Sequence, residues 1–304
     1  MLLAATAAAA LAWTPLPPAS LPRSEVGAAR VGRSIYVVGG FGPGNQTTAA
    51  VERYDIRRKR WRRVRPMPIA LNHTVAVAYR HRLYVSGGYA SATGLSQPSR
   101  VLLRFDPRRR SWTRLRDAPT PRAAHAAAVI GRRLYLAGGA NDSGSLRSLE
   151  IYDFARRAWS RGPDFPGPAR NHTTGVGASG LFYVLAGRDA ENYTAAERYD
   201  PVRRRWQSLP ALRIARGGIA AARLRDGRIV VFGGEELHSD GSTIAEVELF
   251  DPRTRRWSRL PDMRTPRHGL GGAAVGNRVF ALEGGVTPGY SLSPTIEFLD
   301  VRAR

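Results

Sequence analysis

The chain has 304 residues with 43% hydrophobic and 23% charged residues, 32 Gly, 21 Pro and no Cys, and its 47 basic and 24 acidic residues give a net charge of +23. This composition excludes disordered, collagen-like and disulfide-scaffold proteins, and the lack of Cys excludes zinc fingers, thiol nucleophiles, redox pairs and cysteine-linked copper sites. Every basic residue except Lys59 is Arg, an excess explained either by attraction to a polyanion or by codon drift in a GC-rich genome.

The first segment, residues 1–12, is an apolar run that ends in Ala10-Leu11-Ala12. It is similar to the core and cleavage site of a signal peptide, although no basic residue precedes it. It is far shorter than the roughly 20 residues that cross a membrane, so no transmembrane span is expected. We interpret residues 1–12 as a signal segment or a disordered start, which favours export to the periplasm or the cell exterior over the cytoplasm.

A repeat with a period of about 50 residues follows, and such a period indicates stacked or circularly arranged β units. Each copy has a glycine pair after a β-rich run, at Gly39-Gly40, Gly87-Gly88, Gly138-Gly139, Gly233-Gly234 and Gly284-Gly285, with Ala186-Gly187 as a decayed copy. An aromatic or apolar residue followed by Asp comes next, at Tyr54-Asp55, Phe105-Asp106, Tyr152-Asp153, Tyr199-Asp200, Phe250-Asp251 and Leu299-Asp300. A Glu stands two residues earlier in every copy but the second, which has Leu103. A Trp then follows, at Trp61, Trp112, Trp159, Trp206 and Trp257.

Each copy is predicted to form four short strands, which in the third copy span residues 126–130, 133–137, 149–152 and 158–161. The glycine pair, the Tyr-Asp step and the Trp at this spacing resemble the kelch repeat. The resemblance covers residues 13–301 and implies an all-β, six-bladed β-propeller, similar to the central domain of galactose oxidase-like proteins without their copper-site cysteine. The expected blades span residues 23–65, 71–115, 122–162, 170–210, 216–260 and 267–301, with a tail at 302–304.

The last copy ends too early to contain its own outer Trp strand. Trp13 stands at the same distance before the first glycine pair as the other tryptophans do before theirs. Residues 13–22 are therefore expected to supply the outer strand of blade 6 and to close the ring, which removes two exposed sheet edges.

Candidate site residues gather where the chain enters the first strand of each unit. Arginines recur there at a nearly constant distance after each Trp, and histidines, asparagines and one Glu stand close to them. On a propeller they would ring the mouth of the central channel and bind a carboxylate, a phosphate or an acidic sugar through charge-assisted hydrogen bonds. The candidate ligand-binding residues are Arg23, Glu25, Asn72, His73, Arg122, His125, Arg170, Asn171, His172, Arg216, Arg267 and His268.

A structural role competes with ligand binding for each of these residues. Arg is common at this point of kelch repeats and can simply cap blade edges. Neutral imidazoles are good metal ligands, but the sequence has no closely spaced ligand pair, so no metal and no cofactor are expected. No residue is assigned as catalytic.

The loops between second and third strands vary most in length and open on the same face as the channel mouth. We call this the loop face and expect it to be the recognition surface. It carries an acidic cluster, Glu235, Glu236 and Asp240 with His238, which we interpret as a solvated loop. The opposite, turn face carries the tight turns between third and fourth strands, and their many arginines are compatible with weak, salt-sensitive polyanion contact. No aromatic residues alternate with these arginines, so specific nucleic-acid recognition is not expected.

Two functions are compatible with this layout. The first is a non-enzymatic propeller that recognises a protein segment or an anionic carbohydrate on the loop face. The second is an enzyme similar to the six-bladed bacterial N-acetylneuraminate epimerases, which are thought to use Arg with a carboxylate; the corresponding groups would be Arg23, Glu25, Arg122, Arg170 and Arg267. Their motif has no residue-by-residue match in this sequence, so we favour the binding protein.

Overall fold

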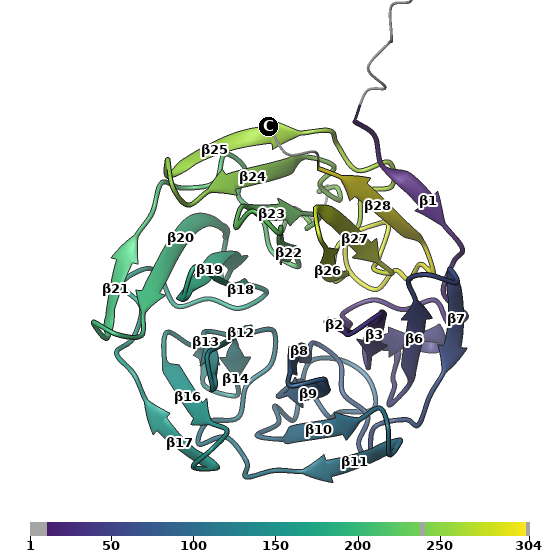
Figure 1. The fold of residues 1–304 in the computed structure, drawn as a ribbon, viewed down its shortest axis with the longest axis horizontal. Helices are drawn as coiled ribbons and strands as arrows, with labels where there is room; N and C mark the ends of the chain where they lie inside the picture. Colours follow the sequence, from purple (N-terminus) through teal and green to yellow (C-terminus); the bar gives the residue numbers. More distant parts are fainter. Residues whose placement is uncertain (1–10, 238–240, 302–304) are drawn as a thin grey trace, which may run out of the picture.

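The computed structural model describes residues 11–237 and 241–301, which form six four-stranded antiparallel sheets arranged as a ring (Figure 1). The six-bladed propeller expected from the sequence is therefore confirmed. Most of the predicted signal segment and the tail at 302–304 lie outside the described residues. Within the described part of the chain, no helix has the length and apolar character needed to cross a membrane.

The strands of each blade are ordered from the channel outward. Blade 1 contains β2 (Gly27–Val31), β3 (Ser34–Val38), β6 (Val51–Asp55) and β7 (Arg60–Arg63). Blade 2 contains β8 (Val75–Tyr79), β9 (Arg82–Ser86), β10 (Leu102–Asp106) and β11 (Ser111–Arg114). Blade 3 contains β12 (Ala126–Ile130), β13 (Arg133–Ala137), β16 (Leu149–Asp153) and β17 (Ala158–Arg161).

The second half of the ring repeats this order. Blade 4 contains β18 (Thr174–Ala178), β19 (Leu181–Arg188), β20 (Asn192–Asp200) and β21 (Arg205–Ser208). Blade 5 contains β22 (Ala220–Arg223), β23 (Ile229–Phe232), β24 (Val247–Asp251) and β25 (Arg256–Leu260). Blade 6 contains β26 (Gly271–Val275), β27 (Arg278–Leu282), β28 (Ile296–Asp300) and the N-terminal β1 (Thr14–Leu16).

The ring closes through β1, as the position of Trp13 predicted. Thr14 pairs with Phe298, and Leu16 pairs with Ile296, so the last blade joins the two ends of the propeller. The Trp13 indole N–H donates to the Pro261 carbonyl at 3.0 Å. Each later Trp makes the same bond to the preceding blade, as in Trp61 to Pro17 and Trp159 to Arg116. The tryptophans therefore join neighbouring blades at the rim.

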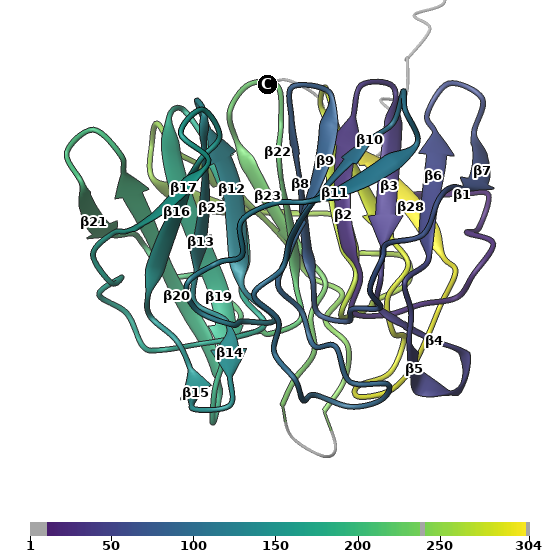
Figure 2. The same cartoon turned by 90° about the horizontal axis from the view of Figure 1, so that it is seen from below.

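The two faces of the ring differ in the length of their loops (Figure 2). The loop face carries two small hairpins, β4 (Phe41–Gly42) with β5 (Gln46–Thr47) around the 3-10 turn η1 (Pro43–Asn45), and β14 (Ala140–Asn141) with β15 (Gly144–Ser145). On the turn face, Asp55 Oδ1 accepts from the backbone N–H of Arg57 and Arg58, at 3.2 and 3.0 Å. Equivalent bonds at Asp106, Asp153 and Asp200 explain why an Asp follows the aromatic residue in each repeat.

A closed circle of backbone hydrogen bonds links each glycine pair to the next blade. The N–H of the second residue donates to the carbonyl where the next blade begins, in the pairs Gly40–Leu71, Gly88–Arg122, Gly139–Arg170, Gly187–Arg216, Gly234–Arg267 and Gly284–Arg23, at 2.8–2.9 Å. Glycine is required here because the backbones of neighbouring blades approach closely. A Cβ on Gly39 would lie 2.2 Å from the Leu71 carbonyl oxygen. In blade 6 the structural pair is Glu283-Gly284, so the sequence assignment of Gly284-Gly285 was wrong by one residue.

Glu283 therefore occupies a glycine position, with a φ of 56°, and its side chain is fully buried. Arg23 Nη2 donates to Glu283 Oε1 at 2.9 Å and to Glu52 Oε2 at 3.2 Å, so two carboxylates share one guanidinium group. Burial raises the pKa of Glu283 to about 7, although Arg23 opposes the shift.

We expect Glu283→Gln to change how the free energy of unfolding depends on pH. Above its ordinary pKa of 4.5 the unfolded Glu283 loses its proton while the folded one keeps it up to about pH 7. Wild-type stability relative to the variant should therefore fall as pH rises through this window, by about 3 kcal/mol at about 1.36 kcal/mol per pKa unit. Urea unfolding of both proteins from pH 4.5 to pH 8 measures the difference, and parallel curves would contradict the assignment.

Candidate functional site

Six residues with positive φ form a ring where the first strands begin, at the loop-face end of the channel. They are Glu25, His73, Ala124, His172, Gly218 and Gly269, with φ from 47° to 69°. Backbone hydrogen bonds connect neighbours in this ring, as in His73 N to Glu25 O at 3.0 Å and Gly218 N to His172 O at 3.1 Å. Three of the six positions have small residues, Ala or Gly. The other three have the large polar side chains of Glu25, His73 and His172.

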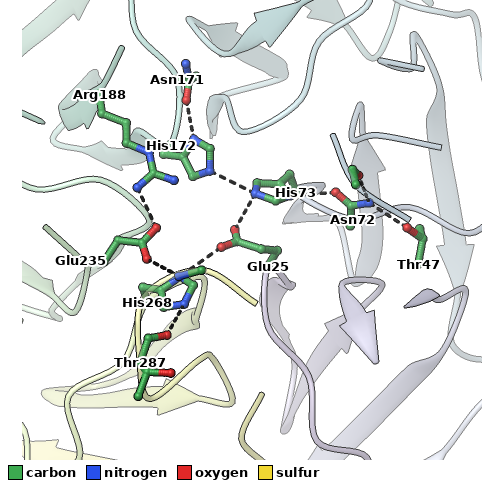
Figure 3. A network of polar contacts seen from close by, with 12 residues as sticks. Glu25, Thr47, Asn72, His73, Asn171, His172, Arg188, Glu235, His268 and Thr287 are labelled. Carbon is green, nitrogen blue, oxygen red and sulfur yellow. Dashed lines mark hydrogen bonds and ion pairs between the residues drawn. The ribbon is translucent and has the colours of Figure 1, made fainter. Parts of the chain in front are cut away.

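Polar side chains from blades 1, 2, 4, 5 and 6 meet at this ring (Figure 3). We call Glu25, His73, His172, Arg188, Glu235 and His268 the channel-mouth cluster. His73 Nε2 lies 3.1 Å from Glu25 Oε2 and 3.0 Å from His172 Nε2. His268 Nδ1 lies 3.2 Å from Glu25 Oε1 and 3.5 Å from Glu235 Oε2, and Arg188 Nη1 lies 2.6 Å from Glu235 Oε1.

Two asparagines hold the histidines from behind. The Asn72 amide donates to Thr47 Oγ1 at 2.8 Å, which leaves Asn72 Oδ1 to accept from His73 Nδ1 at 2.7 Å. Asn171 donates to Ser145 Oγ at 2.7 Å and accepts from His172 Nδ1 in the same way. Each imidazole is therefore oriented with Nδ1 on its asparagine, so that the two Nε2 atoms face each other at 3.0 Å.

Burial and pairing set the charges of the cluster. Burial lowers the pKa of His73, with Glu25 opposing, and burial together with Arg188 holds the pKa of His172 well below its usual value. Burial alone would raise the pKa of Glu25, but His73 and His268 outweigh it and keep this carboxylate ionised. Glu25 and Glu235 likewise outweigh burial at His268 and raise its pKa. Glu25 and Glu235 thus face His268 and Arg188 across the cluster.

The cluster borders a cavity of about 130 Å³ that the first strands enclose. Its walls are lined by small residues, including Gly27, Ala76 and Gly175. The Glu25 side chain is 11% exposed and the His73 side chain 4% exposed, so the cluster is recessed but not sealed from solvent.

The candidate arginines lie behind this ring, inside the blades. The side chains of Arg23, Arg122, Arg170, Arg216 and Arg267 are buried, and each pairs with the Glu of its own repeat, Glu52, Glu150, Glu197, Glu248 or Glu297. Each also donates to the carbonyl of the first residue of its glycine pair, as Arg122 does to Gly138 at 2.8 Å. The expectation that these arginines ring the channel mouth is therefore wrong. Their guanidinium groups lie inside the blades because they pair with a buried Glu and donate to a backbone carbonyl there.

Blade 2 shows what replaces this ion pair. Leu71 stands at the Arg position and Leu103 at the Glu position, and both are buried in one hydrophobic cluster. The two departures from the repeat therefore compensate each other.

Of the remaining candidate residues, most belong to the channel-mouth cluster or support it, and one packs between two blades. His73, His172 and His268 meet in the cluster, with Asn72 and Asn171 behind them. His125 lies one residue past the ring, and its Nε2 lies 3.0 Å from Ser86 Oγ between two blades. Burial lowers the pKa of His125 to about 3, so it is a neutral packing residue.

Sequence reasoning missed Arg188 and Glu235 as partners of the histidines. Each directly follows the glycine pair of its blade, and the backbone of each bridges to a ring-entry residue, Arg188 to Asn171 and Glu235 to Gly217. That shared position was the available signal. The interpretation of the acidic cluster as a solvated loop is wrong for the buried Glu235, whereas Glu236 is exposed; His238 and Asp240 lie outside the described residues.

The repeat pattern identified in the sequence also appears in known proteins. The family model described as KLHDC2/KLHL20/DRC7 Kelch-repeats domain matches residues 25–215, and the model described as Kelch motif matches residues 220–264. Kelch-like protein terF of Aspergillus terreus is 29% identical over 94% of this chain and 67% of its own length. Human Kelch-like protein 34 is 36% identical over 39% of this chain, which covers only 19% of that protein.

A solved structure has the same architecture over nearly the whole chain. The structure titled "Structure of YjhT" superposes with a TM-score of 0.82 and covers 95% of this chain and 98% of its own, at 17% sequence identity. At this level of identity the similarity establishes the fold.

We expect the buried Arg–Glu pairs to be replaceable only as a unit. Arg122→Leu alone should lower the free energy of unfolding by about 3–5 kcal/mol, because Glu150 is left buried without its cation. The double variant Arg122→Leu/Glu150→Leu reproduces blade 2 and should recover most of this loss. Urea unfolding of the wild type, both single variants and the double variant gives the coupling energy, and additive losses would contradict the compensation inferred from Leu71 and Leu103.

Proposed function

The chain belongs to the kelch-repeat family, and we propose that it is a binding propeller that recognises a protein segment or an anionic carbohydrate on its loop face. The observation that carries this proposal is the combination of a recessed polar cluster with apolar side chains exposed beside it. A rigid scaffold that presents variable loops around such a recess is typical of a recognition surface.

Tyr290 is the best-placed apolar contact. It is 54% exposed, on the long loop of blade 6, and its ring packs edge-on against Phe41 at 5.4 Å. Phe41 in turn packs edge-on against His73 of the channel-mouth cluster at 5.8 Å. A ligand that stacks on Tyr290 would therefore reach the polar groups of the cluster with its next substituent. Leu95 and Val286 are also exposed, on the loops of blades 2 and 6.

The charge of the cluster favours a ligand with both donors and acceptors. Arg188 and His268 already face Glu235 and Glu25, so an anionic group must compete with two carboxylates for them. A peptide segment can bind both the donors and the acceptors of the cluster through its backbone C=O and N–H groups. Its apolar side chains can contact Tyr290, Leu95 and Val286. An acidic glycan satisfies it through hydroxyl groups and one carboxylate.

We expect Tyr290→Ala to weaken ligand binding by at least about tenfold, since an exposed aromatic anchor typically contributes more than about 1.4 kcal/mol. A thermal-shift screen with acidic peptides, acidic sugars and phosphorylated sugars would identify the ligand class, and calorimetric titration would compare affinities. Val202→Ala is the matched control, because Val202 is 89% exposed on the turn face. Equal affinities of the two variants for the same ligand would refute the loop-face assignment.

One feature of the cluster favours the alternative of a sugar-acid epimerase or mutarotase. The Glu25 carboxylate and the His268 imidazole lie 3.2 Å apart in a partly exposed recess, as a base and an acid for proton transfer would. Exchange between the anomers of N-acetylneuraminate, followed by NMR, separates the two functions. Accelerated exchange that Glu25→Gln abolishes would favour the enzyme, and binding without acceleration would favour the recognition protein.

We propose a second, weaker interaction, between the turn face and a polyanion. A groove of about 570 Å³ between blades 2 and 3 is lined by seven arginines. Among the ion pairs of the described residues, four of these arginines have no carboxylate partner: Arg80, Arg104, Arg116 and Arg157. Tyr79 and Phe154 also line the groove, but they stack on each other at 4.2 Å, which argues for charge rather than base stacking.

We expect Arg157→Glu to weaken binding of a sulfated oligosaccharide more than Arg255→Glu does. The two residues end equivalent turns in blades 3 and 5, with φ of 54° and 57°, but only Arg157 lines the groove. Fluorescence anisotropy at low and high salt measures the effect, and the wild-type affinity should fall steeply as salt rises. Equal losses in both variants would point to the net charge of the molecule instead of the groove.

A further inference from the structure

We propose that Glu25, His73 and His172 form a binding site for a divalent transition-metal ion, with Zn²⁺ the ion that their donor atoms suit best. The site would lie at the loop-face end of the channel, on the axis of the propeller. Two imidazoles and one carboxylate are an established ligand set for zinc. This inference is independent of the proposed recognition function, because it concerns the metal alone.

The ligand atoms already converge. His73 Nε2 lies 3.0 Å from His172 Nε2 and 3.1 Å from Glu25 Oε2, and the three atoms all lie within 4.8 Å of one another. Bonds of about 2.0–2.2 Å to a tetrahedral ion place neighbouring ligand atoms about 3.3–3.6 Å apart. The two pairs that include His73 would open by a few tenths of an ångström, and the Glu25 carboxylate and the His172 ring, within 4.8 Å of each other, would close by up to about 1 Å.

The hydrogen bonds behind the histidines orient both rings so that their Nε2 atoms face each other. Asn72 Oδ1 accepts the Nδ1 proton of His73, and Asn171 Oδ1 accepts that of His172. Each amide is oriented by its own donation, to Thr47 Oγ1 and to Ser145 Oγ. Two imidazole nitrogens and a carboxylate oxygen thus converge on one position, where a metal ion would bind. Metal-binding histidines typically donate their other N–H to an oxygen in this manner.

The carboxylate is oriented as well. His268 Nδ1 lies 3.2 Å from Glu25 Oε1, which leaves Oε2 directed toward His73. Gly269 makes room for this arrangement, since a Cβ there would lie 2.3 Å from Glu25 Oε1. The remaining charges beside the site, Arg188 and Glu235, neutralise each other at 2.6 Å.

The backbone gives an independent indication. Glu25, His73 and His172 have φ of 54°, 50° and 47°, whereas the equivalent residues of the other blades are Ala124, Gly218 and Gly269. A large side chain in this conformation is strained, and such strain is concentrated at functional sites. Ala124 also lies between His73 and His172 around the ring, and its short side chain lets the two imidazoles meet.

The test is metal binding by the full chain after treatment with a chelator. Calorimetric titration with Zn²⁺ should show one equivalent bound, and Co²⁺ should give the visible absorption of a four- or five-coordinate site. His73→Asn and His172→Asn should each weaken Zn²⁺ binding at least about 100-fold, and Asn72→Ala about 10–100-fold. Asn tolerates a positive φ, and Ala is already present as Ala123 at the position equivalent to Asn72, so both changes preserve the backbone.

His81→Asn is the matched control, because His81 also has a positive φ, 60°, but is exposed at a turn. It should bind Zn²⁺ as the wild type does, and metal-free thermal unfolding should show that all variants are folded. The proposal is overturned if the folded wild type takes up no stoichiometric Zn²⁺, or if His73→Asn and His172→Asn bind it as tightly as His81→Asn. Failure here would leave the loop-face recognition proposal intact, since that proposal is tested at Tyr290.

Discussion

The six hydrogen bonds from the glycine pairs to the neighbouring blades are the constraint on which the rest of the structure depends. Each requires the backbone of one blade to touch the start of the next so closely that a Cβ on Gly39 would lie 2.2 Å from a carbonyl oxygen. The accepting carbonyl belongs to the residue at the Arg position. The same contact that holds two blades together therefore fixes the point where the first strand begins, and with it the positive-φ residue that faces the channel.

The buried Arg–Glu pairs secure this contact from within each blade. Arg122 joins the Gly138 carbonyl to Glu150, so a strand end, a glycine pair and the third strand share one side chain. The apolar alternative, Leu71 with Leu103, shows that the fold does not need the charges as such. Buried ion pairs often contribute little net stability compared with apolar residues of similar size. Their geometric role, fixing the direction of one strand relative to the next, is the better explanation for five repetitions.

The fold could be predicted from the sequence because each repeated residue has a local structural role, such as a turn or a contact with the next blade, that recurs from blade to blade. Trp13 identified the closing strand, and the Asp after each aromatic residue marked a turn. The site was predicted only in part. The histidines and asparagines were found by their common position, but the arginines turn inward toward Glu residues that the repeat also displayed. Arg188 pairs with Glu235, and Glu235 with His268, across different blades, and the sequence signalled these two residues only through their shared position after the glycine pair. Glu283 was missed because the adjacent Gly284-Gly285 imitates the motif one residue late.

The pairing of β1 with β28 has a consequence for how the protein is made. Trp13 bonds to a carbonyl 248 residues further along the chain, so β1, the first strand of the propeller to be synthesised, is among the last to find its partner. At about 5–20 residues per second this delay is on the order of 15–60 s, during which blades 1 to 5 can form in order but the ring stays open. An open ring exposes the unpaired edge of a sheet to other chains. The channel mouth contains residues from both blade 1 and blade 6, such as Glu25 and His268, so it can be completed only after blade 6 has been synthesised.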